Sequence, residues 1–169
     1  ETQDLVYAPD WNFLPLHTYT KIHEGNALRM DWNKVLPNYA CHFVMGNPPF
    51  VGTLLMSDEQ RKDMRLFFDK PRYLDYVTCW YIKAMQYAKG TKIHCAFVST
   101  NSITQGGEVP ALWPTLLEAG LKIDFAYRSF VWSNETRNNA HVHCVIIGLS
   151  FAAHRKQKIL FDNNTYKIV

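Results

Sequence analysis

The sequence of 169 residues has little charge imbalance, few cysteines and no long apolar run. No stretch reaches the roughly 18 apolar residues of a membrane-spanning helix, so we expect no membrane partner. Its 18 Lys and Arg against 15 Asp and Glu leave a net charge of +3, which permits a nucleic-acid partner without requiring one. No internal repeat or low-complexity segment is evident, which excludes solenoids and disordered tails.

Metal and redox sites also find little support in the sequence. The cysteines, Cys41, Cys79, Cys95 and Cys144, are widely spaced and form no Cys-x-x-Cys knuckle. Each lies in an apolar run, which favours buried, reduced thiols of an intracellular protein. His141 and His143 could share one face of a strand, but no third ligand is near, and we predict no metal site.

Periodicity and turn residues predict one α/β domain. The pattern favours a mostly parallel sheet with an antiparallel edge strand, because strands and helices alternate along most of the chain. Ser57 and Gln60 have the form of a capping box at the start of a helix. The expected helices are 58–69, 77–88 and 109–119, and the expected strands are 41–45, 93–99, 123–128 and 142–151, followed by a hairpin of 159–161 and 166–169.

The segment Asn47-Pro48-Pro49-Phe50 follows a buried strand, where ligands bind in such sheets. Proline has a fixed φ and no N–H, and a residue before proline is restricted to extended geometry, so the segment is stiff before a ligand arrives. It offers hydrogen-bond acceptors, the Asn47 side-chain oxygen and the Pro48 carbonyl, without neighbouring backbone donors. An amino group with two hydrogens would satisfy both, and a base could stack on Phe50.

Asn-Pro-Pro-Phe after an apolar strand resembles the catalytic motif of amino-group methyltransferases that use S-adenosylmethionine. Three further blocks occur in the order of that family. Residues 25–32, Gly-Asn-Ala-Leu-Arg-Met-Asp-Trp, resemble its loop for the cofactor adenine, with Asn26 in place of the usual acid. Residues 97–106 resemble the strand beside the target base, and residues 129–134 with 140–148 resemble the far side of its pocket.

The four blocks span residues 25–148 and look most like the methyltransferase domains of large bacterial restriction–modification fusion enzymes. The resemblance implies methyl transfer from S-adenosylmethionine to N6 of an adenine flipped out of double-stranded DNA, in the bacterial cytoplasm. The implied catalytic residues are Asn47, Pro48, Pro49 and Phe50. The implied cofactor contacts are Asn26, Ala27, Leu28 and Asn47. The implied substrate contacts are Phe50 and one of Phe130 and Trp132, which share a face of an extended segment.

The family's glycine-rich cofactor motif, a strand followed by Phe-x-Gly-x-Gly, has no counterpart in the sequence, nor has the acidic residue that would hold the cofactor ribose. We therefore expect residues 1–169 to be the C-terminal part of a Rossmann-like class I methyltransferase domain. The glycine-loop strands and a target-recognition domain would lie elsewhere. Residues 1–169 alone are then expected to bind S-adenosylmethionine weakly and to be inactive, with an exposed sheet edge through which copies could pair.

Several alternatives stay open at this point. Methylation of cytosine N4 uses similar chemistry. Protein-glutamine methyltransferases share an Asn-Pro-Pro-Tyr motif, and RNA is a further substrate. A different class is a non-catalytic module that only binds DNA or another partner, which the missing glycine motif would favour.

Overall fold

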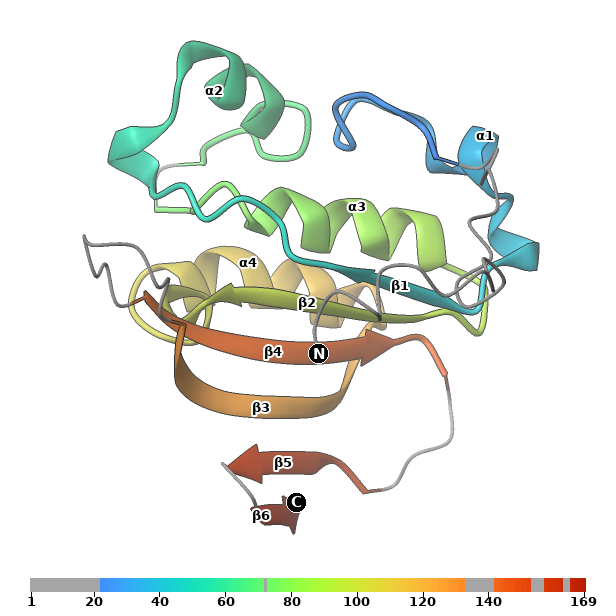
Figure 1. Cartoon of the computed structure of the whole chain (residues 1–169), viewed down its shortest axis with the longest axis vertical. Helices are drawn as coiled ribbons and strands as arrows, with labels where there is room; N and C mark the ends of the chain where they lie inside the picture. The colour runs from blue at the N-terminus through green and yellow to red at the C-terminus, as the bar shows by residue number, and fades with distance from the viewer. Residues whose placement is uncertain (1–21, 72, 133–141, 153–156, 163–164) are drawn as a thin grey trace, which may run out of the picture.

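Six strands form one mixed sheet in the part of the chain that the computed structural model describes, residues 22–71, 73–132, 142–152, 157–162 and 165–169. They are β1 (Phe43–Gly46), β2 (His94–Thr100), β3 (Lys122–Trp132), β4 (Val142–Ser150), β5 (Ile159–Asp162) and β6 (Thr165–Ile168). Their order across the sheet is β1-β2-β4-β3-β5-β6 (Figure 1).

Most of these strands point in one direction. β1 runs parallel to β2 and β3 runs parallel to β5, whereas β4 is antiparallel to β2 and β3, and β6 is antiparallel to β5. The expected α/β fold class, with mostly parallel strands and an antiparallel edge strand, is confirmed. One feature was not expected, because β4 also runs antiparallel and lies inside the sheet between β2 and β3.

The longer helices cover one face of the sheet. They are α3 (Thr78–Ala88), which lies over β1 and β2, and α4 (Glu108–Glu118) (Figure 1). The loop before α1 (Trp32–Val35) and helix α2 (Asp58–Met64) lie beyond α3, on its side away from the sheet (Figure 1). Short 3-10 turns occupy Asn38–Ala40, Thr53–Leu55 and Asn101–Thr104. Within the described residues, no helix combines the length and apolar character that crossing a membrane requires.

Helix α3 is buried on two sides, the one that faces the sheet and the one opposite. Tyr81 packs on Phe97 of β2 and on Trp113 of α4, with ring centroids 5.3 Å and 6.1 Å apart. On the opposite side, the Cys79 thiol lies 3.1 Å from the sulfur of Met64 in α2. The helix is thus a middle layer between the sheet on one side and α2 with the loop of residues 22–31 on the other (Figure 1), which explains why Cys79 as well as Tyr81 is fully buried.

Two helix predictions need adjustment. The capping box is present, with the Gln60 N–H donating to Ser57 Oγ and the Ser57 N–H to Gln60 Oε1, but α2 ends at Met64 and not near residue 69. Hydrogen bonds from residues 66–68 back to Asp63 and Met64 continue the chain as turns. The helix expected over 109–119 begins one residue earlier, at Glu108, and is continuous through Pro114, although a proline inside a helix removes one backbone hydrogen bond.

Candidate active site

The carboxyl ends of β1, β2 and β3 share one edge of the sheet, and three of the four sequence blocks identified above include or follow these ends. Residues 47–50 follow β1, and Asn101–Thr104 follow β2. Cys144 of β4 lies opposite both Thr100 of β2 and Phe130 of β3, so Phe130 is level with the end of β2. A hydrogen bond of 3.5 Å from Asn101 Nδ2 to Ser129 Oγ joins the two strand ends.

The segment Asn47–Phe50 is irregular, as its prolines require. Asn47 is exposed and Pro48 is buried, whereas Phe50 is half-buried. Beyond it the chain is held by Val51, whose carbonyl accepts the Tyr76 N–H at 2.9 Å. Among the described residues, none hydrogen-bonds to the Asn47 carboxamide, which leaves its oxygen available to a ligand.

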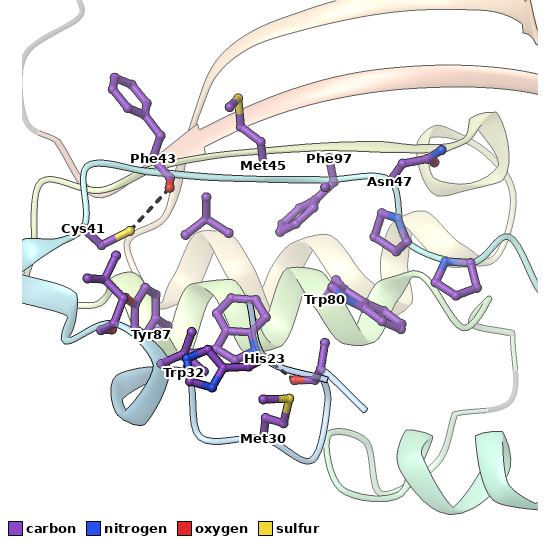
Figure 2. A pocket seen from close by; sticks show the side chains of 17 residues that line it. His23, Met30, Trp32, Cys41, Phe43, Met45, Asn47, Trp80, Tyr87 and Phe97 are labelled. Carbon is purple, nitrogen blue, oxygen red and sulfur yellow. Dashed lines mark hydrogen bonds between the residues drawn. The ribbon is translucent and has the colours of Figure 1, made fainter. Parts of the chain in front are cut away.

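A groove of about 570 Å³ runs beside β1, with Asn47 at one end (Figure 2). Trp80 and Tyr87 of α3 and Trp32 of α1 supply aromatic wall, and Phe97 points from β2 toward the same helix (Figure 2). Other lining residues are His23, Ala27, Met30, Val35, Leu36, Cys41, Phe43, Val44, Met45, Gly46, Pro48 and Pro49. Its volume lies within the usual range of small-molecule sites, and its lining is mostly apolar with few polar groups.

The three cofactor residues expected on the N-terminal loop occupy different environments. Ala27 lines the groove, and its carbonyl accepts the indole N–H of Trp32 at 2.8 Å. Leu28 is buried in the core. Asn26 is exposed and its carboxamide is hydrogen-bonded within the protein, as its oxygen accepts the Leu28 N–H at 2.9 Å. The groove therefore joins Ala27 with Asn47, Pro48 and Pro49, while Asn26, Leu28 and Phe50 lie outside its lining.

The candidate substrate aromatics of β3 share a face, as the extended segment predicts. The ring centroids of Phe130 and Trp132 are 6.3 Å apart. Phe130 is half-buried and Trp132 is exposed. Residues 133–134 and 140–141 of this block, His141 among them, lie outside the described residues, whereas residues 142–148 belong to β4.

Comparison with known proteins assigns the chain to a family. Residues 3–162 match the family described as MmeI, DNA-methyltransferase domain. The chain belongs to the MmeI DNA-methyltransferase domain family. A solved structure of the type IIL restriction–modification enzyme MmeI in complex with DNA is 43% identical, with a TM-score of 0.82 over 93% of this chain. DNA methyltransferase A of Bacillus subtilis (strain 168) is 41% identical over 161 residues, 92% of this chain.

This member of the MmeI methyltransferase domain family spans only part of those relatives. It covers 22% of the MmeI chain and 18% of DNA methyltransferase A. The resemblance found in the sequence is confirmed at the level of the family.

The structure of this family member adds a buried carboxylate that sequence patterns did not indicate. Asp63 of α2 is 1% exposed and accepts hydrogen bonds from Asn26 Nδ2 at 2.9 Å, Arg29 Nε at 2.6 Å and the Tyr76 hydroxyl at 2.6 Å. Burial works to raise the pKa of Asp63, but the hydrogen bonds from Tyr76, Arg29 and Asn26 outweigh it, so the pKa lies below its ordinary value. An ionised Asp63 thus ties α2 to the loop that carries Ala27.

A lysine holds the same loop from the other side. Lys83 Nζ donates to the carbonyl oxygens of Leu28 at 2.9 Å and Met30 at 2.6 Å. It also lies 5.9 Å from the centroid of the Trp32 ring. Among Lys, Arg, Asp and Glu, α3 contains Lys83 alone. A single charge in an otherwise apolar helix could have indicated from the sequence that this side chain has a specific partner.

A pair of acidic residues lies behind the end of β2. The Asp75 carboxylate accepts the Thr53 N–H at 3.2 Å and the Ser102 hydroxyl at 2.9 Å. Glu108, the first residue of α4, is 5% exposed, and its Oε2 has no hydrogen-bond partner among the described residues. Burial, followed by the charge of Asp75, raises the pKa of Glu108 to about 8.

Glu108 therefore makes stability depend on pH. Between the ordinary pKa of 4.5 and the raised value of about 8, folded protein holds a proton that unfolded protein lacks, so the free energy of unfolding falls as pH rises. Glu108→Gln removes this dependence and should raise Tm at pH 8 while leaving it unchanged near pH 4.5. Thermal unfolding from pH 4.5 to 8.5 measures it, with exposed Glu118→Gln on the same helix as control. Parallel pH profiles for Glu108→Gln and the native protein would contradict the prediction.

Proposed function

We propose that this domain transfers a methyl group from S-adenosylmethionine to the exocyclic N6 amine of an adenine flipped out of double-stranded DNA. It would do so as part of a bacterial restriction–modification enzyme of the cytoplasm. The observation that carries the proposal is the Asn47 carboxamide, free of partners among the described residues, beside Pro48 at the end of β1. Membership of the MmeI methyltransferase domain family and the DNA complex of MmeI support DNA as the substrate.

The two acceptors suit an amine whose lone pair is delocalised into the base. Asn47 Oδ1 and the Pro48 carbonyl would accept its two N–H groups and favour a pyramidal nitrogen, whose lone pair then points at the methyl group. This is a positioning effect, because the stiff Pro-Pro segment holds both acceptors before the substrate arrives. An amide cannot take up the proton that the amine loses, so the proton would leave to water after transfer.

The groove fits the cosubstrate in size and chemistry. Its lining includes Ala27, Pro48 and the aromatic ring of Trp80, which offer apolar surface to an adenosyl group. When bound, S-adenosylmethionine supplies the activated methyl group. The residues of this chain that would hold it are Ala27 and Asn47 at the groove, with Asn26 and Leu28 shaping the loop.

Extrusion of the base would be compensated by stacking. Flipping a base out of a duplex costs a few kcal/mol, since pairing and stacking are lost. Phe50 is half-buried directly after the acceptors, and stacking on one aromatic ring returns about 1–3 kcal/mol. Phe130, level with the end of β2, and Trp132 beyond it are candidates for the opposite wall.

The proposal is tested by identifying the methylated product. The intact enzyme that contains residues 1–169 is incubated with isotopically labelled S-adenosylmethionine and, in parallel, with duplex DNA, RNA and a glutamine-containing peptide. Digestion of the DNA followed by chromatography of the nucleosides should give labelled N6-methyladenine. Label in N4-methylcytosine, in RNA or in the peptide would contradict adenine N6 as the methyl acceptor and identify the acceptor instead. DNA binding without label in any product would favour the non-catalytic alternative.

Phe50→Ala tests the stacking role separately. We expect catalytic efficiency on DNA to fall by about 5–150-fold, the equivalent of losing about 1–3 kcal/mol of stacking. Steady-state kinetics and 2-aminopurine fluorescence, which reports an extrahelical base, measure the effect. Tyr166→Ala, which removes an exposed aromatic on β6, is the control. Unchanged kinetics and fluorescence in Phe50→Ala would argue against a flipped base at this position.

The free edge of β1 supports a proposal about assembly. Among the described residues, β1 pairs on one side alone, with β2, and its Phe43 and Met45 side chains are 67% and 79% exposed. Figure 2 shows both side chains pointing away from the aromatic wall of the groove. An unpaired, apolar edge strand is a template for another strand, so we include self-association through β1 in the proposal.

A further inference from the structure

The carboxamide of Asn26 is held in one orientation by two partners of opposite kind. Its Nδ2 donates to Asp63 Oδ2 at 2.9 Å, and its Oδ1 accepts the Leu28 N–H at 2.9 Å. An ionised carboxylate accepts hydrogen bonds and cannot donate them. Asp63 therefore dictates which end of the amide faces α2, and the oxygen is left on the side of the loop.

Asp63 itself is firmly placed. Arg29 Nε donates to its Oδ1 at 2.6 Å, and the Tyr76 hydroxyl donates to its Oδ2 at 2.6 Å. Asp63 is 1% exposed, so its carboxylate cannot rotate into solvent if the side chain at position 26 does not offer a hydrogen-bond donor. A carboxylate at position 26 would lie at hydrogen-bond distance from the Asp63 carboxylate. Neither group would carry a proton to donate, and the repulsion between two negative charges is strongly unfavourable away from water.

We propose that Asp63 is a positioning residue for the adenosyl group of S-adenosylmethionine, acting through Asn26. It aligns the Asn26 side-chain oxygen, and with it the backbone of Ala27 at the groove. It also makes an amide, and not an acid, the side chain that position 26 requires. The inference rests on the proposed function, since it assigns the cosubstrate to the groove that Ala27 lines.

The loop has a second attachment that does not depend on Asp63. Lys83 holds the carbonyls of Leu28 and Met30 from α3. Loss of the Asp63 contact should therefore disturb the Asn26 end of the loop while the Met30 end stays in place. The expected defect is one of ligand affinity more than one of folding.

A charge swap between positions 26 and 63 tests the inference. The variants are Asn26→Asp, Asp63→Asn and the double variant, made in the intact enzyme that contains residues 1–169. Titration calorimetry gives the Kd for S-adenosylmethionine, and thermal unfolding without ligand gives Tm. We expect Asn26→Asp and Asp63→Asn each to weaken binding by about tenfold or more. The double variant restores an acceptor–donor pair and should return to within about threefold of the native Kd.

Glu59→Gln is the matched control. Glu59 also binds Arg29, at 2.8 Å, but this pair is solvent-exposed and does not touch Asn26. The Kd should change by less than about twofold, as exposed ion pairs contribute little. A loss equal to that of Asp63→Asn would show that Arg29 carries the effect, and would overturn the assignment to Asn26.

Other outcomes separate this inference from the proposed function. Native-like affinity in a folded Asn26→Asp variant overturns the inference and leaves methyl transfer intact. A double variant that binds no better than its single variants overturns it as well. If Asn26→Asp alone does not fold, the double variant decides, because restored folding and binding are the expected result. Failure of the intact enzyme that contains residues 1–169 to bind S-adenosylmethionine contradicts the proposed function, whereas weak binding by residues 1–169 alone is expected.

Discussion

Asn47→Ala is expected to lower the rate of DNA methylation by about 10²–10³-fold or more, the usual effect of removing one preorganised polar contact from a transition state. The Asn47 oxygen would accept a hydrogen from the target amine as its nitrogen becomes pyramidal. Water in its place cannot hold the same geometry. Since the carboxamide hydrogen-bonds to none of the described residues, its removal leaves no buried group unpaired, and the fold should be unaffected.

Single-turnover methylation with saturating cosubstrate measures this loss, and the unfolding temperature checks the fold. Asn33→Ala, on the exposed surface of α1, is the control and should methylate at the native rate. Asn47→Asp keeps a side-chain acceptor and should retain far more activity than Asn47→Ala. Native-like methylation by Asn47→Ala, or equal losses in the Ala and Asp variants, would refute the role given to the oxygen.

The features that were predicted correctly from the sequence are those determined by interactions between residues close together in the chain. The apolar run before Gly46, the two prolines after it and the Ser57–Gln60 capping box are each readable within a few residues. The strand formed by that run is, however, an exposed edge of the described sheet and not the buried strand expected. The apolar spacing of residues 77–88 is readable over three turns; of its members Val77, Tyr81, Ala84 and Ala88 are buried, whereas Trp80 is half-buried and lines the groove. The family resemblance rested on the same short segments, which is why it located the Asn47 segment correctly at a strand end.

Contacts between distant segments account for what was missed. Asn26 and Asp63 are 37 residues apart, and no periodicity within either segment links them. The same holds for β4, whose apolar sequence suits a strand but does not say that it inserts between β2 and β3. Gly148 of β4 is a further case, since a Cβ there would overlap the Phe125 ring of the neighbouring strand. The raised pKa of Glu108 at the start of α4 likewise depends on burial and on the charge of Asp75, which is distant in sequence.

The largest effect on stability is expected from Phe97→Ala, which should lower the free energy of unfolding by about 3–5 kcal/mol. Phe97 is 2% exposed and packs on Tyr81 with ring centroids 5.3 Å apart. In the parallel register it lies beside Gly46, and its ring is 3.5 Å from where a Gly46 Cβ would stand. Losing the ring would open a cavity beneath the residue that precedes Asn47, so the acceptors should lose their alignment as the fold loses stability.

Urea unfolding measures the loss, and the residual methylation rate below the transition measures the misalignment. Phe43→Ala on β1 is the control, since its side chain is 67% exposed and its removal should cost within about 0.5 kcal/mol. Phe97→Leu fills most of the space and should cost less than about 1.5 kcal/mol, with most activity kept. If Phe97→Ala cost no more than Phe43→Ala, the ring would not support the end of β1. In that case the stiffness of the Asn47 segment would come from its two prolines alone.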